Sequence, residues 1–148
     1  MKLEHAVAIA APADPFWSRV MDIPEAARCI PGAAAVAPTS PGKFKGTVLA
    51  QVGPVRLVLD GEIAVVTRDD VARRASPRAS AKDTRLGGTL RAQIDVEVTE
   101  APGGSRLRIS ADVQVGGRIG EFGQTVIERK STQLLEQFVQ CVAAAATR

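Results

Sequence analysis

An amphipathic pattern near the C-terminus constrains the fold more than any other part of this 148-residue sequence. Its apolar residues recur at steps of three and four, which is the period of one face of an α-helix. A helix with one apolar face needs another element to cover that face. The residues of the pattern are Ile119, Phe122, Val126, Ile127, Leu134, Leu135, Phe138 and Val142.

Most of the chain before this predicted helix shows the alternation of β-strands. Residues 2–10 alternate, and so do residues 44–52 and 55–66, which flank Gly53-Pro54. A hairpin about that pair places residues whose numbers sum to 107 opposite each other. Leu49 then faces Val58 on the otherwise polar side of the hairpin.

Three more strands are predicted in the middle of the chain. Residues 71–82 alternate between alanine and basic side chains, and Pro77 predicts a bulge or a local loss of pairing there. Residues 89–99 and 105–115 form a second hairpin whose partners sum to 205. This register joins the apolar faces of both strands and brings Glu97 opposite Arg108.

Two short helices are predicted after the first strand. Asp14 stands before Pro15, an order typical of an N-cap and the first helical position, and this helix runs to about Asp22. Pro24 ends it and opens a second helix through Ala27. We predict one α+β domain, residues 1–148, in which a curved antiparallel sheet of six to seven strands wraps around the long C-terminal helix.

The apolar part of the composition consists mostly of small side chains. Hydrophobic residues make up 45% of the chain, but only four Phe and one Trp are aromatic, and Tyr is absent. Small side chains fill a core only where helix and sheet come close together, and otherwise they leave a cavity. The composition alone allows either outcome.

The cysteines and the termini bear on location. Cys29 and Cys141 are far apart and lack CxxC spacing, so we expect two reduced, partly buried thiols rather than a disulfide. The N-terminal residues lack the apolar segment of a signal peptide, and no run approaches the ~20 apolar residues of a membrane span. We therefore expect a soluble, cytoplasmic protein.

The sequence offers little material for catalysis. His5 is the only histidine, and its place in the first strand indicates a wall residue rather than a member of a triad. Cys29 has no identifiable base, and no Cys/His cluster has metal-ligand spacing. The glycines of residues 116–123 lack dinucleotide-site spacing. We predict no catalytic residue, no metal and no covalently bound cofactor.

Binding has more support, because the inward faces of the strands and the helix are almost entirely apolar, as in a small-molecule chamber. Three cations could act as polar donors at its mouth, although a side chain extending to solvent is the simpler interpretation of each: Arg28, Arg118 and Lys130. The predicted walls are Phe16, Val20, Val48, Ala50, Leu57, Leu59, Ala79, Ile94, Ile109, Val113, Ile119, Phe122, Val126, Ile127 and Leu134.

The surface suggests two further interpretations. A basic strip is a solvated face by default, and the alternative is docking to an acidic enzyme surface or to anionic headgroups. It lacks the interleaved aromatics of single-strand readers, which argues against nucleic acid. The exposed pair Leu49 and Val58 is an alternative contact for a homodimer or another partner. The strip consists of Arg73, Arg74, Arg78, Lys82, Arg85 and Arg91.

The layout and four motifs resemble a known family. The layout is similar to the helix-grip fold of the START/Bet v 1-like (SRPBCC) superfamily. The motifs resemble one branch of it, the family of the carbon monoxide dehydrogenase G protein. They are PADPFW at residues 12–17, ARCIPG at 27–32, QVGPV at 51–55 and DVQVGGRIGEFGQTVI at 112–127.

The resemblance implies a carrier or accessory role beside a molybdenum hydroxylase, with a non-covalently held isoprenoid quinone or lipid as ligand. The sequence departs from the family in two places. Residues 76–88 are more basic than the glycine-rich segment expected there, and no tail follows the long helix, which argues against self-anchoring to a membrane but leaves peripheral contact open. Two alternatives stay open: a polyketide cyclase or dehydratase, and a purely structural assembly factor.

Overall fold

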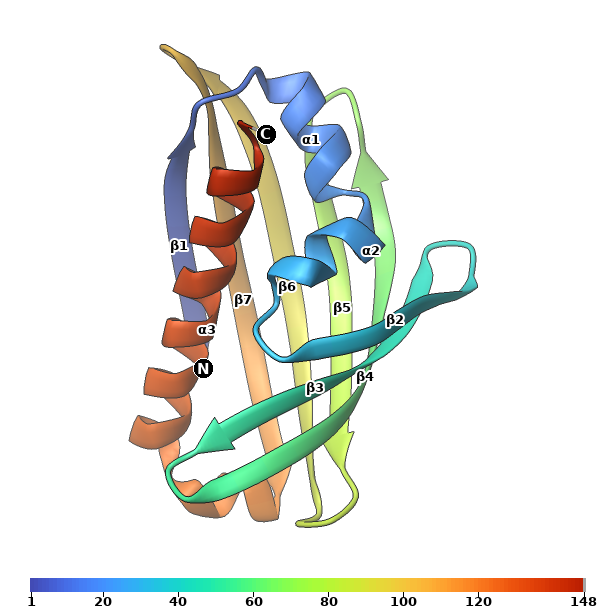
Figure 1. The fold of residues 1–148 in the computed structure, drawn as a ribbon, viewed down its shortest axis with the longest axis vertical. Coiled ribbons are helices and arrows are strands. Elements are labelled where there is room, and N and C mark those ends of the chain that lie inside the picture. The colour runs from blue at the N-terminus through green and yellow to red at the C-terminus, as the bar shows by residue number, and fades with distance from the viewer. Residues whose placement is uncertain (148) are drawn as a thin grey trace.

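The computed structural model describes residues 1–147 and shows a seven-stranded antiparallel sheet curved around one long helix (Figure 1). The strand order is β1-β7-β6-β5-β4-β3-β2, so the first and last strands are neighbours. The elements are β1 (Lys2–Ile9), α1 (Ala13–Val20), α2 (Ile23–Ala26), the 3₁₀ helix η1 (Ala27–Cys29), β2 (Ala33–Ser40), β3 (Lys43–Val52), β4 (Val55–Asp69), β5 (Arg74–Asp83), β6 (Gly88–Ala101), β7 (Gly104–Gly117), the 3₁₀ helix η2 (Arg118–Phe122) and α3 (Gln124–Ala145).

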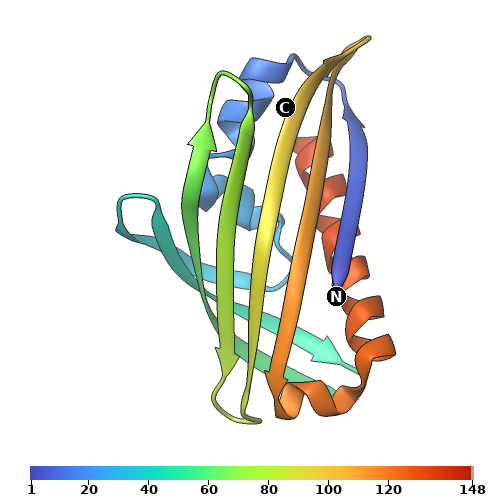
Figure 2. The ribbon, with the colours of Figure 1, turned by 180° about the vertical axis from the view of Figure 1, so that it is seen from behind.

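All the helices cover one face of the sheet. α3 runs along β1, and α1 and α2 lie near the opposite edge, as Figure 1 shows. The view from behind shows the other face of the sheet without any helix over it (Figure 2). The predicted α+β class and the curved sheet around a C-terminal helix are therefore confirmed. Within residues 1–147, no helix combines the length and the apolarity that a membrane crossing needs.

Both predicted hairpin registers are confirmed. Leu49 pairs with Val58 between β3 and β4, and Glu97 pairs with Arg108 between β6 and β7. The disturbance predicted at Pro77 is also present. The register of β4 against β5 shifts there, leaving Val66 as an extra residue, and the β5–β6 ladder skips Pro77.

Two predicted helix starts are wrong. α1 begins at Ala13 after Pro12, so Asp14 lies in the first turn instead of capping the helix, and its carboxylate binds Arg73. The long helix begins at Gln124 and not at Ile119. Gly123 has φ of 90°, a left-handed conformation that a right-handed helix cannot include, so residues 118–122 form the separate helix η2.

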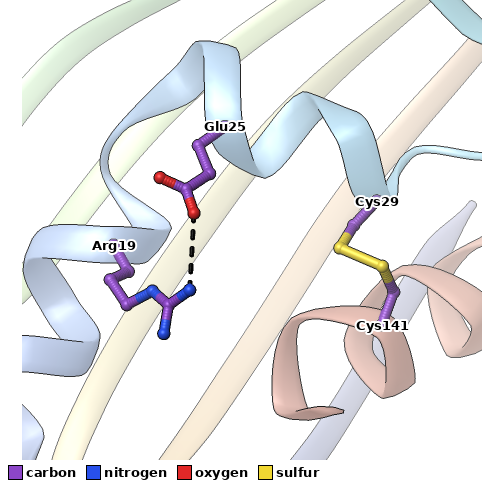
Figure 3. The surroundings of a disulfide bond; sticks show 4 residues. All are labelled: Arg19, Glu25, Cys29 and Cys141. Atoms are coloured by element: carbon purple, nitrogen blue, oxygen red, sulfur yellow. Dashed lines mark hydrogen bonds and ion pairs between the residues drawn. A yellow bond between two sulfur atoms is a disulfide. The ribbon is translucent and has the colours of Figure 1, made fainter. Parts of the chain in front are cut away.

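The prediction of two reduced thiols is wrong. Cys29 of η1 and Cys141 of α3 form a disulfide, with 5.4 Å between their Cα atoms (Figure 3). The bond is close to an ion pair in which Arg19 and Glu25 approach to 3.4 Å. It joins the ARCIPG segment covalently to the C-terminal half of α3. Packing of distant segments brings the two cysteines together, and local sequence spacing cannot reveal that proximity.

The buried core is divided into two clusters at opposite ends of the sheet. The upper cluster surrounds α1 and the C-terminal half of α3, and the lower cluster surrounds the β3–β4 turn and η2. The buried residues of the upper cluster are Ile9, Ala13, Phe16, Trp17, Val20, Met21, Ala75, Val96, Val98, Leu107, Ile109, Val139 and Val142. Those of the lower cluster are Val52, Leu57, Leu59 and Ile119.

Candidate ligand-binding site

Between the two clusters lies a group of inward-facing residues that belong to neither, which we call the middle layer. One row of directly paired residues crosses five strands, from Phe44 through Ile63, Ala79 and Ala92 to Val113. Every member of the layer is half-buried. The remaining members are Leu3 and His5 of β1, Ala111 of β7, and Lys130, Ser131 and Leu134 of α3.

α3 passes from one cluster to the other across this layer. Ile127, near its start, packs against the lower cluster, whereas Leu135 and Phe138 pack against the upper cluster. Lys130 and Ser131 lie between these contacts, about one turn from Ile127. The helix therefore presents a polar interval to the sheet where neither cluster supports it.

The sheet side of the middle layer is built from short side chains. Ala79, Ala92 and Ala111 lie on three adjacent strands and reach only a small distance toward α3. Side chains that point inward and still keep exposed surface are what an apolar small-molecule site needs, because a ligand can cover them. The half-burial of this layer is the property that sets it apart from the two clusters.

The predicted chamber residues are distributed over the three levels. Phe16, Val20, Ile94 and Ile109 belong to or pack against the upper cluster. Leu57, Leu59, Val48, Ala50, Ile119, Phe122 and Ile127 belong to or pack against the lower cluster. Ala79, Val113 and Leu134 lie in the middle layer.

One predicted wall residue is wrong. The side chain of Val126 is 42% exposed. Successive residues of an α-helix are turned by about 100°, so Ile127 takes the inward position in this turn and Val126 does not. The sequence pattern included both because each fits a step of three or four.

The three predicted mouth cations differ in their surroundings. Arg28 is exposed on η1. Arg118 is exposed on η2 and lies 3.9 Å from Glu121. Lys130 alone is half-buried and faces the middle layer, so the structure brings it together with Leu134 and the sheet but leaves the two arginines outside.

The lower end is closed by a buried acid that the sequence analysis missed. Asp83 is only 2% exposed, and its carboxylate accepts hydrogen bonds from the backbone N–H groups of Val58, Arg85 and Leu86 at 2.8–3.0 Å. The bond from Leu86, together with those from Val58 and Arg85, lowers the pKa of Asp83 below its ordinary value. An Asp at a strand end before a Gly-containing turn is the signal that predicts such a loop.

The upper end is held by two contacts between α1 and the β4–β5 turn. The indole Nε1 of Trp17 donates to Asp70 at 2.8 Å, and Arg73 binds Asp14 at 2.8 Å. The hydrogen bond from Arg68, and then that from Trp17, lowers the pKa of Asp70. Arg73 thus belongs to this closure and not to the predicted basic strip.

The outer face of the sheet carries two adjoining open hollows of about 580 and 570 Å³. Their linings are largely polar, and three basic-strip residues contribute to them: Arg78, Lys82 and Arg91. Arg74, in contrast, pairs with Glu97 at 2.7 Å. Leu49 is 52% exposed on the same face, as its predicted position requires.

The fold and the middle layer define this chain as a helix-grip protein of the START/Bet v 1-like class. The chain matches the model of the carbon monoxide dehydrogenase CoxG family over residues 6–147. It therefore belongs to that family, as the four sequence motifs indicated. No curated protein matches the chain in sequence.

Solved structures with the same fold are distant in sequence. A conserved protein from Geobacillus kaustophilus is 16% identical with a TM-score of 0.88, and the match covers 99% of this chain and 95% of that one. The Zhui aromatase/cyclase from Streptomyces sp. R1128 is 17% identical with a TM-score of 0.71, covering 100% and 94%. The di-domain ARO/CYC BexL is 17% identical with a TM-score of 0.67, covering 97% and 45%. These likenesses show the fold alone.

Proposed function

We propose that this chain is a non-catalytic carrier or accessory protein that holds an apolar small molecule between the sheet and α3. The middle layer carries the proposal, because its inward side chains are mostly small and apolar, and they are only half-buried. Membership of the CoxG family supports a partnership with a molybdenum hydroxylase of the carbon monoxide dehydrogenase kind. An isoprenoid quinone or a lipid is the ligand that we propose.

The residues present suit such a molecule. A long apolar ligand can cover Ala79, Ala92 and Ala111 and gain the free energy of removing apolar surface from water. A carbonyl or an acid at its end can accept a hydrogen bond from Lys130. The ends of the space are already closed by the two clusters, so the ligand's length is limited to what the middle layer and its mouth can take.

Mass spectrometry tests the carrier function directly. Protein purified without detergent is measured under native conditions and then extracted with organic solvent, and the extract is analysed for quinones and lipids. We expect a stoichiometric apolar molecule in both measurements. Protein that carries none, and that takes up neither a quinone nor a fatty acid when they are supplied, would contradict the proposal.

A matched pair of substitutions locates the ligand. Ala92→Phe adds a ring to the middle layer, and Gln93→Phe adds the same ring on the opposite face of β6, where Gln93 is exposed. Ala92→Phe should abolish uptake, whereas Gln93→Phe should leave it unchanged. Equal uptake by both variants would place the ligand elsewhere.

The partner is tested on the outer face. Arg78, Lys82 and Arg91 take part in none of the ion pairs found within residues 1–147, so their charge is available to an acidic enzyme surface or to anionic lipids. Binding to purified molybdenum hydroxylase subunits should weaken with salt and with the triple change to glutamine. Binding to anionic vesicles instead would favour peripheral membrane contact.

A cyclase or dehydratase acting on polyketide-like rings is the second candidate. Two ionisable side chains, His5 and Lys130, lie in the middle layer, which satisfies the minimum that acid–base chemistry requires. Turnover of a linear poly-β-keto substrate, lost in His5→Leu, would support this function. No turnover with a substrate that binds would remove it.

A structural assembly factor is the third candidate, and the exposure of Leu49 favours it. In this case Leu49→Glu should disrupt a homodimer or a complex with the hydroxylase, and Ala92→Phe should not. The opposite result would assign the complex to the ligand-bound form of the carrier.

A further inference from the structure

We infer that Lys130 and Ser131 form a head-group site in this chamber that binds the carboxylate of an amphipathic acid, such as a long-chain fatty acid. The inference rests on the proposed carrier function, because it names the class of ligand that the chamber holds. Three observations lead to it: the position of the two residues, their lack of partners, and the composition of the layer around them.

The position places a cation inside the outline of the fold. Lys130 and Ser131 are both half-buried, between the contacts of Ile127 with the lower cluster and of Leu135 with the upper cluster. The other members of the middle layer, apart from His5, are Leu, Phe, Ile, Val or Ala. An ammonium group among such side chains is desolvated in part, and an anion beside it offsets that cost.

The protein itself supplies no such anion. Lys130 takes part in none of the ion pairs or side-chain hydrogen bonds that the structure shows for residues 1–147. Carboxylates three or four positions away along a helix are the usual partners of a lysine, but these positions hold Val126, Ile127, Gln133 and Leu134. The polar interval of α3 is therefore left for a ligand group.

The nearest inward-facing acid is already committed. Asp83 belongs to the lower end of the sheet, where three backbone N–H groups bind its carboxylate. The middle layer thus contains a lysine, a histidine and a serine but no acid. All three can donate a hydrogen bond, and only Lys130 brings a charge that is permanent at neutral pH, so a carboxylate suits the layer better than a neutral carbonyl.

The tail of the acid then has one apolar course. From the head group on α3, it crosses the layer over Ala111, Ala92 and Ala79 toward Ile63 and Phe44, following the row of cross-strand partners. These alanines leave the most room opposite the helix. A straight acyl chain can follow such a row, and every methylene that it buries adds to binding.

Head-group selectivity tests the inference. The probes are cis-parinaric acid, its methyl ester and decylubiquinone, each titrated into the full chain at pH 7.5 with fluorescence readout or competition. We expect the acid to bind at least about tenfold more tightly than the ester, the preference that one charge-assisted hydrogen bond gives. Equal affinity for acid, ester and quinone would overturn the head-group site but leave the carrier function standing. Failure to bind any of the three would overturn both.

Variants assign the selectivity to Lys130. Lys130→Met keeps the length of the side chain and removes the charge, so it should abolish the preference for the acid while leaving the ester affinity unchanged. Lys130→Arg should retain the preference, and Lys82→Met, on the exposed outer face of β5, serves as the matched control. Equal loss of acid and ester binding in Lys130→Met, or no loss at all, would show that the lysine merely extends to solvent.

Discussion

Cys29 and Cys141 lie 112 positions apart in the sequence, yet their Cα atoms are 5.4 Å apart and a disulfide joins their side chains. The bond connects η1, which precedes the ARCIPG turn, with the part of α3 that packs on the upper cluster. The C-terminal half of α3 is thus held both by packing and by a covalent bond. Its N-terminal half, which carries Lys130, depends on the lower cluster alone.

Removing this disulfide should lower stability by a large amount. A cross-link that closes a loop of about a hundred residues restricts the unfolded chain by about 4–5 kcal/mol in the chain-entropy account. We therefore expect Cys29→Ser/Cys141→Ser to lower the free energy of unfolding by up to this amount, measured by urea denaturation under non-reducing conditions.

Reduction provides the control for that experiment. Dithiothreitol should lower the stability of the natural chain to that of the double variant and should leave the double variant unchanged. A disulfide is unusual in the cytoplasm, which is the location predicted from the sequence. Trapping of free thiols in cells by alkylation measures whether the bond is present there, and stability independent of the reductant would contradict its structural role.

Much of the sheet could be predicted because one of its faces is buried. In such a sheet a slip of one residue turns every side chain to the wrong face, so the alternation around Leu49 and Val58 determines the register. The same reasoning held for Glu97 and Arg108. Alternation tells which face a side chain occupies, but not how deeply it is covered, so the middle layer could not be separated from the two clusters in the sequence.

The helix start and the disulfide escaped prediction for other reasons. Ile119 and Phe122 are three residues apart, a spacing that a 3₁₀ turn satisfies as well as an α-helix, and only the conformation of Gly123 separates the two. The pairing of Cys29 with Cys141 depends on how η1 and α3 pack, which no local pattern contains. Lys130 was found because it interrupts an otherwise apolar stripe.

Gly32 should not tolerate a side chain. It ends the ARCIPG motif with φ of 81°, and a Cβ there would collide with the backbone oxygen of Leu49. We expect Gly32→Ala to cost about 2 kcal/mol or more in the free energy of unfolding, from the left-handed conformation and from the displacement of β3. Gly53→Ala is the matched control, since its φ is 58° but nothing lies within 4 Å of a Cβ. Equal losses would show that backbone conformation alone matters.

Asp83 should make stability depend on pH in the acid range. Hydrogen bonds from Leu86, Val58 and Arg85 lower its pKa in the folded state, so its stabilising effect is complete above the ordinary pKa of Asp, ~4, and is lost as the pH falls through the lower folded value. Asp83→Asn should be less stable at pH 7, because its amide group would face one of these N–H donors. The difference from the natural chain should shrink toward pH 3 in denaturation experiments. A constant difference across this range would exclude the ionised carboxylate as the cause.

The contact between Trp17 and Asp70 should hold α1 onto the sheet. The indole is almost fully buried in the upper cluster and donates to Asp70, which also accepts a hydrogen bond of 2.7 Å from Arg68. Trp17→Phe removes the donor and leaves a gap beside Phe16, so we expect a loss of about 2 kcal/mol in the free energy of unfolding. Asp70→Asn keeps an acceptor for Trp17 but removes the charge that Arg68 binds, and should cost less.

The double variant then separates packing from hydrogen bonding. If the indole acts through Asp70, the combined loss should be smaller than the sum of the two single losses, because either change already breaks the contact. Full additivity would mean that Trp17 stabilises the upper cluster by volume alone. In that case the β4–β5 turn would be free to move without loosening α1, and hydrogen exchange at the N–H groups of α1 would be the same in Asp70→Asn as in the natural chain.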